Sequence, residues 1–218
     1  MSKRPFFLFA PGAGAPSTSR WMVAWRKRLE TLGDVVAFDY PYMRAGRKSP
    51  DRPPVLIAAH REALASAVAD LASGRPVFLI GKSMGGRMGC HLAAEEAADP
   101  SPTLPRPIAG LICLGYPLQS GATGAMRDEV LIALRTPILF VQGTRDPLCP
   151  LDKLAVVRPR MTAPNRLFVV EGGDHSLEVS AQQRKAAGET QADSDARVLA
   201  AIAGFVQDPA PISSPVPR

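Results

Sequence analysis

Residues 77–86 read VFLIGKSMGG, which is a short apolar run followed at once by a glycine-rich turn. The four apolar residues predict a buried strand, and the residues from Met84 to about Ala98 predict a helix. Between the strand and the helix lies Gly81–Gly85, a G-x-S-x-G pattern. At such a junction the serine is held in a strained backbone conformation, and the glycines avoid a clash between strand and helix. We therefore predict that Ser83 is a nucleophile.

The amide of the residue after this serine stands at the start of the predicted helix. A helix N-terminus carries a partial positive charge, so negative charge that develops beside it is stabilised. We predict that the backbone amide of Met84 faces the oxyanion of a tetrahedral intermediate.

Working outward from residue 77, apolar runs alternate with helical patterns along the chain. The other predicted strands cover residues 6–10, 35–38, 108–114, 138–141 and 167–170. Continuous apolar strands alternating with helices indicate a parallel sheet that is covered on both faces. The expected fold is one α/β domain over residues 1–206, doubly wound around a mostly parallel sheet of about six strands. Residues 207–218 hold four prolines and predict a flexible tail.

Three helices are expected in the second half of the chain, near 123–134, 151–161 and 194–206. The last of them has an amphipathic pattern in which Val198, Ile202 and Phe205 share one face.

Composition places the chain among ordinary globular proteins. Of 218 residues, 46% are hydrophobic and 21% are charged, which excludes disorder of the whole chain. No apolar run is long enough to span a membrane, and we expect no signal peptide. Three widely spaced cysteines predict reduced thiols in the cytoplasm. The net charge of +6 is not arranged as a basic run with interleaved aromatics, so we expect no nucleic-acid partner. Oligomeric state is left open.

A serine nucleophile needs a base, and the chain holds three histidines. His175 lies in the segment GGDHS directly after the last predicted strand. His60 and His91 fall on predicted helices, where a histidine usually has a structural role. We therefore predict that His175 is the base.

The acid that orients the base should lie at the same carboxyl edge of the sheet. Asp146 follows the strand at 138–141, and Pro147 fixes the turn behind it. Asp174 is the rival, but its position next to His175 makes a bond to that ring sterically awkward. Asp39 also follows a strand but precedes the serine, and we interpret it as structural. The prediction is Asp146.

A second oxyanion donor is expected in the loop after the first strand. Residues 10–14 read APGAG, and small residues allow a backbone amide to approach an oxyanion closely. We choose Ala13, with Gly12 and Gly14 as neighbouring alternatives. The same loop also suggests a dinucleotide-binding start, but the third glycine of that motif is missing because position 17 is serine.

The segments APGAG and GKSMGGR resemble the α/β-hydrolase fold, and the resemblance extends over nearly the full length, to about residue 206. The order serine, aspartate, histidine is the chain order of these enzymes. The two segments look like a dienelactone-hydrolase-like subgroup related to testis-expressed protein 30 and to KAT8 regulatory NSL complex subunit 3. This resemblance implies a triad of Ser83, Asp146 and His175.

What the resemblance implies for activity is hydrolysis of an ester or thioester of a small-molecule acyl substrate, through an acyl-enzyme. We expect no cofactor and no metal, because the chain shows no cluster with ligand spacing. A catalytically inactive protein that keeps the fold as an interaction module is the alternative.

The chain departs from the family pattern in several places. Pro11 and Gly12 replace the usual His-Gly pair of the oxyanion loop, and Ser83 stands where dienelactone hydrolases proper use cysteine. The first strand would be the third of the full fold, so the sheet is expected to be trimmed. Only 21 residues separate Gly115 from Pro137, too few for a substantial cap domain. These features predict an open, shallow site.

Residues 43–53 add a charged feature near the expected site. Arg44, Arg47, Lys48 and Arg52 face a single acid, Asp51, which makes the local charge +3. The loop begins at the carboxyl edge of the predicted sheet, so it could attract anionic substrates. A solvated loop that only aids solubility is the alternative.

Overall fold

The computed structural model describes residues 3–69, 74–99, 104 and 106–209. Its sheet has six strands, all parallel, in the order β2-β1-β3-β4-β5-β6. The strands are β1 (Phe6–Ala10), β2 (Asp34–Ala37), β3 (Val77–Lys82), β4 (Ile108–Leu114), β5 (Ile138–Gly143) and β6 (Asn165–Val170). The predicted fold class is thereby confirmed, with the strands within a few residues of their expected places.

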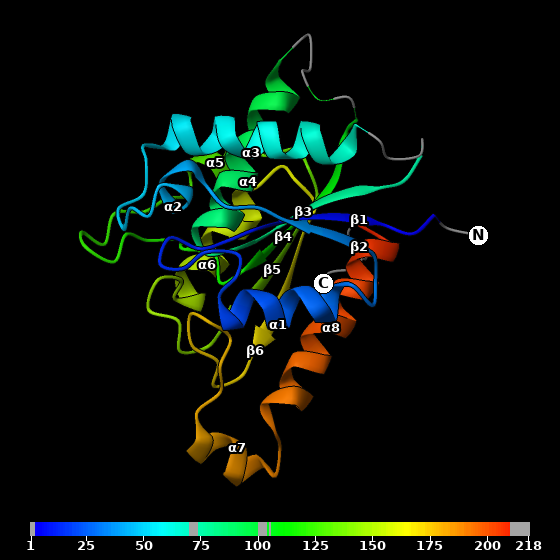
Figure 1. Cartoon of the computed structure of the whole chain (residues 1–218). Coiled ribbons are helices and arrows are strands. Elements are labelled where there is room, and N and C mark those ends of the chain that lie inside the picture. The colour runs from blue at the N-terminus through cyan, green and yellow to red at the C-terminus, as the bar shows by residue number, and fades with distance from the viewer. Residues whose placement is uncertain (1–2, 70–73, 100–103, 105, 210–218) are drawn as a thin grey trace, which may run out of the picture.

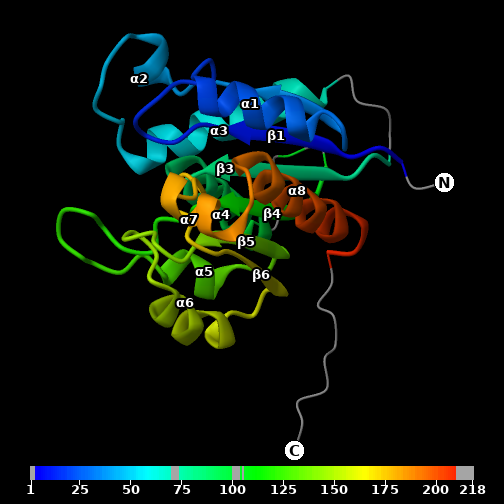
Figure 2. The ribbon, with the colours of Figure 1, turned by 90° about the horizontal axis from the view of Figure 1, so that it is seen from below.

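Helices cover both faces of this sheet (Figure 1). On one face lie α3 (Pro53–Val68), α4 (Met84–Ala98), α5 (Glu129–Ala133) and α6 (Leu151–Val157). On the other lie α1 (Arg20–Leu29) and α8 (Gln191–Gln207). Seen from below, α1 and α8 lie in front of the sheet (Figure 2).

Strand β1 shows why both layers form. Phe6 and Leu8 pack into the core beneath α3 and α4, whereas Phe7 and Phe9 pack into the core beneath α1 and α8. Side chains alternate between the two faces of a strand, so a strand that is apolar throughout needs cover on both sides. Each fully buried large apolar side chain contributes about 1.5–3 kcal/mol relative to an exposed one.

The strand order reverses between β1 and β3, because β1 lies between β2 and β3 while the later strands follow on the far side of β3. The helices that follow β1 and β3, α1 and α4, therefore lie on opposite faces of the sheet. In open α/β sheets, ligands bind at the carboxyl edge beside such a reversal. Ser83 follows β3 and the APGAG loop follows β1.

Several expected helices have different limits in the structure. The helix expected near 123–134 is reduced to α5, because Gly124 has φ +68° and Gln119 pairs with Met126 in an antiparallel bridge. The helix expected at 151–161 ends at Val157, and a 3₁₀ turn, η1 (Arg158–Arg160), follows it.

The last helix begins three residues earlier than expected and runs to Gln207. Thr190 and Asp193 form a capping box that satisfies the first backbone amides. Two short helices were not expected: α2 (Pro41–Arg44) and α7 (Ala181–Ala187). Of the predicted tail, residues 210–218 lie outside the described residues.

Candidate active site

The turn between β3 and α4 holds Ser83 in a backbone conformation that few residues adopt. Its φ is 49° and its ψ is −114°. A side chain on Gly81 would overlap the backbone of Gly86, and one on Gly85 would lie 2.5 Å from the carbonyl oxygen of Ala10. Glycine is therefore required on both sides of the serine, because strand, turn and helix approach each other too closely for a Cβ atom.

The structure brings the three predicted side chains together in one chain of hydrogen bonds. The distance from His175 Nε2 to Ser83 Oγ is 2.8 Å, and the distance from His175 Nδ1 to Asp146 Oδ2 is also 2.8 Å. An ionised carboxylate can only accept, so the proton between His175 and Asp146 belongs to Nδ1. Nε2 is then free to accept the serine proton.

Asp146 is a buried carboxylate in a fixed position. Its exposed fraction is 3%, and the backbone amide of Leu148 donates to Oδ1 over 2.8 Å. The side-chain amide of Gln142, at the end of β5, donates to Oδ2 over 3.0 Å. Both oxygens thus have partners, which holds the carboxylate where it meets His175.

The rival carboxylate has a different task. Oδ1 of Asp174 accepts hydrogen bonds from the backbone amides of Ser176 and Glu178, at 2.7 Å and 3.0 Å. This side chain closes the turn that carries His175. Asp39, in turn, accepts from the backbone amide of Ser17 over 2.6 Å and so shapes the segment before α1.

The other two histidines lie apart from this chain of hydrogen bonds. His60 is fully buried on α3, where Nδ1 lies 3.3 Å from the hydroxyl of Tyr40, and burial lowers the pKa of His60 to about 3. His91 is half-buried on α4, and burial followed by the charge of Arg87 lowers its pKa. Both rings favour the neutral state, as expected for structural histidines.

The two predicted oxyanion donors belong to segments that adjoin Ser83. Met84 is the first residue of α4. The APGAG loop passes beside Ser83, since a side chain on Gly12 would lie 3.6 Å from the Cβ atom of Ser83. The hydroxyl of Tyr42 donates to the carbonyl oxygen of Ala13 over 2.8 Å, which fixes the loop from the side of α2.

A pocket of about 250 Å³ opens beside the serine and the histidine. Ala13, Trp21 and Lys82 contribute to its wall. Neither Trp21 nor Lys82 was predicted from the sequence as a site residue. A signal for Lys82 existed, because it is the variable residue immediately before the serine in the G-x-S-x-G pattern.

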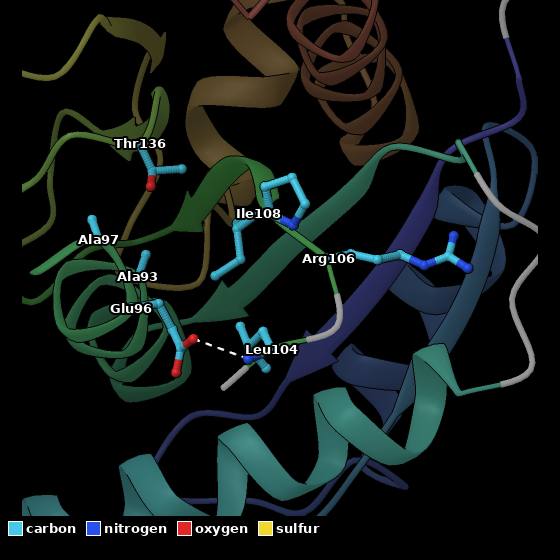
Figure 3. Close-up of a pocket in the computed structure, with 8 residues that line it drawn as sticks. Ala93, Glu96, Ala97, Leu104, Arg106, Ile108 and Thr136 are labelled. Atoms are coloured by element: carbon cyan, nitrogen blue, oxygen red, sulfur yellow. Dashed lines mark hydrogen bonds between the residues drawn. The ribbon is translucent and has the colours of Figure 1, made fainter. Parts of the chain in front are cut away.

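A larger pocket, of about 460 Å³, lies at the amino edge of the sheet, where the strands begin (Figure 3). Its wall includes Ile108, which begins β4, whereas Leu114 at the other end of β4 pairs in register with Lys82. Glu96 in this pocket is held by Arg61 and by the backbone amide of Leu104. The pocket is thus separated from Ser83 by the length of a strand.

Neither a group of three metal-ligating side chains nor a helix long and apolar enough to cross a membrane occurs among the described residues.

Comparisons with known proteins bear on the fold of this chain. A family model described as an alpha/beta hydrolase domain matches residues 3–207. A serine hydrolase homologue from Coxiella burnetii is 17% identical, with a TM-score of 0.64 over 94% of this chain and 85% of that one. Est1E from Butyrivibrio proteoclasticus is 16% identical, with a TM-score of 0.64 over 96% of this chain and 89% of that one. A dienelactone hydrolase from Anabaena variabilis is 17% identical, with a TM-score of 0.60 over 88% and 84%. At these identities the likeness concerns the fold.

Proposed function

The chain belongs to the α/β-hydrolase family, and from this membership we propose that it is a serine hydrolase that cleaves an ester or thioester through a triad of Ser83, His175 and Asp146. The observation that carries the proposal is the pair of 2.8 Å distances from the two ring nitrogens of His175 to Ser83 and Asp146. A base oriented by a third group and within reach of the nucleophile is the arrangement that acyl transfer requires.

In the proposed mechanism, Ser83 Oγ attacks the carbonyl carbon while His175 Nε2 takes the serine proton. Asp146 stabilises the resulting imidazolium, and the backbone amides of Met84 and Ala13 hold the oxyanion. His175 then donates the proton to the leaving group, which departs from the acyl-enzyme. Water, deprotonated by His175, attacks the acyl-enzyme and releases the acid. None of these steps needs a metal or a cofactor.

The size of the pocket supports a small or surface-presented acyl group. A volume of about 250 Å³ is below the range of roughly 300–1,000 Å³ that is usual for drug-sized ligands. Between β4 and β5 the chain contributes only the short helix α5, so no cap domain rises there over the serine. A long lipid chain would remain largely in water.

Two further assignments are part of the proposal. The segments APGAG and GKSMGGR favour the dienelactone-hydrolase-like subgroup that includes testis-expressed protein 30 and KAT8 regulatory NSL complex subunit 3. All three cysteines are free and buried, and a reducing compartment such as the cytoplasm suits them. The proposed partner is a small acyl substrate, with neither a nucleic acid nor a membrane.

The experiment that tests the function uses a fluorophosphonate probe and p-nitrophenyl esters of increasing chain length. We expect the probe to label the wild-type protein, and short esters to be hydrolysed fastest. Ser83→Ala should abolish labelling and lower kcat by about 10³-fold or more, with a melting temperature close to that of the wild type. Ser120→Ala, in the loop after β4, is the matched serine control and should keep both activities.

A folded wild-type protein that neither reacts with the probe nor hydrolyses any ester of the panel would contradict the proposal. That result would favour the interaction module, because the fold alone does not determine an activity.

A further inference from the structure

Two consecutive carbonyl groups in the loop that carries the base are each held by a side chain from another element. The ammonium of Lys82, at the end of β3, donates to the carbonyl oxygen of His175. The indole nitrogen of Trp21, on α1, donates to the carbonyl oxygen of Ser176 over 2.9 Å. Lys82 Nζ also lies 5.4 Å from the centre of the Trp21 ring, within the range of a cation–π contact. The four groups form one connected unit.

The backbone leaves room for this contact at Gly115. This glycine follows β4 with φ +69°, and a Cβ atom there would lie 2.5 Å from the carbonyl oxygen of His175 and 3.3 Å from Lys82 Nζ. A side chain at position 115 would therefore occupy the space in which the lysine meets the histidine loop. Glycine permits both the positive φ and the close approach.

The contact between Lys82 and the His175 loop matters because Lys82 is next to the nucleophile in the chain. Lys82 immediately precedes Ser83, so the residue that bonds the backbone of the base is covalently joined to the nucleophile. Movement of the histidine loop away from the serine would break this hydrogen bond. Small displacements of catalytic groups are costly, since misplacement by about 1 Å can lower the rate about 100-fold.

Two opposing influences act on the pKa of the Lys82 ammonium. Burial lowers the pKa of Lys82 to about 8, and the negative charges of Asp146, Asp174 and Glu178 oppose that shift. These carboxylates come from the loop after β5 and from the loop after β6, the two loops that carry the acid and the base. The lysine thus changes its charge within the pH range in which an esterase can be assayed.

We propose that Lys82 is a positioning residue, whose protonated side chain holds the His175 loop against the turn that carries Ser83. The inference rests on the proposed function and adds to it a residue that touches neither reacting atom. A protonated amine is a stronger hydrogen-bond donor than a neutral one. The loop is therefore held most firmly below the pKa of Lys82, and kcat falls as the pH rises through that value.

The test is the pH profile of kcat with p-nitrophenyl acetate, from about pH 6 to about pH 10, for the full chain and its variants. Lys82→Met keeps the aliphatic stem beside Trp21 and removes the ammonium. We expect it to lower kcat about 10-fold to 100-fold at neutral pH, to change KM less than about twofold, and to lose the alkaline decline. Lys27→Met, an exposed lysine on α1, is the matched control and should keep the wild-type profile.

Trp21→Phe gives a second, independent variant. The phenyl ring keeps an aromatic face for Lys82 but removes the donor to Ser176, so kcat should fall severalfold while the alkaline decline near pH 8 remains. If Lys82→Met does not fold, a wild-type profile that stays flat through pH 8 still contradicts the inference.

Three results would overturn the inference: wild-type kcat in Lys82→Met at neutral pH, an alkaline decline that persists in that variant, or a wild-type profile that stays flat through pH 8. The proposed function fails separately, through absence of fluorophosphonate labelling in the wild-type protein, and the role of Lys82 would then fall with it. Labelling of Ser83 together with an unchanged profile in Lys82→Met would overturn the role of Lys82 alone.

Discussion

The side-chain nitrogen of Gln142 lies 3.0 Å from Oδ2 of Asp146, the same oxygen that contacts Nδ1 of His175. Gln142 is fully buried, and its own oxygen accepts a hydrogen bond from the backbone amide of Tyr116. The orientation of the amide is therefore set, with oxygen toward β4 and nitrogen toward the acid. Strand β5 thus carries the donor, and the loop directly after β5 carries the carboxylate that this donor holds in place.

This arrangement predicts the effect of changing the acid. In the wild type, Oδ2 of Asp146 accepts from Gln142 and from Nδ1 of His175. In Asp146→Asn an amide group takes the place of this oxygen, so His175 would be held in the wrong tautomer. We expect a loss on the order of 10⁴ in kcat, by analogy with other triads. Asp174→Asn should cost far less, because an asparagine oxygen can still accept from the amides of Ser176 and Glu178. Steady-state kinetics of both variants measure the ranking.

The reverse ranking would show that Asp174 is the acid. Labelling of Ser83 by the fluorophosphonate probe in both variants serves as the control for an intact turn.

The close approach of strand and helix at the nucleophile predicts a large difference between two glycines. Gly85→Ala places a Cβ atom 2.5 Å from the carbonyl oxygen of Ala10, and no flexible side chain is there to yield. We expect the free energy of unfolding to fall by about 1–3 kcal/mol, as for other overpacked sites. Gly204 is exposed on α8 with open space around it, so Gly204→Ala should raise the free energy of unfolding by about 0.5–1 kcal/mol. Urea unfolding of both variants would reveal the contrast, and similar values would show that the turn can relax.

These relationships show what could be predicted from the sequence. The meeting of Ser83, Asp146 and His175 could be predicted because each follows an apolar run, and the carboxyl ends of parallel strands meet at one edge. The fold was predicted for the same reason. Helix α7 was missed because it is exposed on nearly all sides and has no apolar stripe, being recognisable only from the cap at Ser180 and the left-handed Gly188.

The supporting residues were missed for a different reason. Gln142 lies within a buried strand, where a sequence pattern does not show whether a polar side chain has found a partner. Lys82 and Trp21 are 61 residues apart and meet only because β1 and β3 are neighbours, with α1 packed against the same face. Long side chains reach partners that periodicity cannot identify.

Buried His60 predicts how stability responds to acid. Its pKa of about 3 in the folded protein compares with about 6.5 in the unfolded chain. Between these values the unfolded chain binds a proton that the folded protein does not, so stability is present above about pH 6.5 and is lost as the pH falls toward 3. The loss amounts to about 1.4 kcal/mol per pH unit.

Substitution by leucine removes this dependence. His60→Leu should weaken the fold modestly at pH 7 through loss of the Tyr40 contact. Between about pH 7 and pH 4.5 its free energy of unfolding should fall by about 2–3 kcal/mol less than that of the wild type. His91→Leu, at a half-buried position, should change this difference less. Urea unfolding at the two pH values measures this change in the free energy of unfolding. Equal changes in the wild type and His60→Leu would rule out His60 as the cause of the acid sensitivity.

The basic segment at residues 43–53 directly follows Tyr42, whose hydroxyl donates to the carbonyl oxygen of Ala13 in the loop beside Ser83. Arg47 is paired with Asp51 over 2.7 Å, so the local charge of +3 rests on Arg44, Lys48 and Arg52. Positive charge beside an open pocket raises the local concentration of anionic substrates and speeds their capture. Salt screens such attraction over about 10 Å at 0.1 M ionic strength.

We therefore expect kcat/KM for an ester with a free carboxylate to fall about twofold to tenfold as ionic strength rises, while a neutral ester of equal size stays constant. Replacing Arg44, Lys48 and Arg52 with glutamine should remove the difference between the two esters and leave the rate for the neutral ester unchanged. The same number of glutamines at Arg26, Lys27 and Lys185, which are exposed on α1 and α7, controls for net charge and should preserve the difference. Equal salt responses of both esters in the wild-type protein would leave the segment with solubility as its role, because an attraction that does not distinguish charged from neutral substrates is not steering.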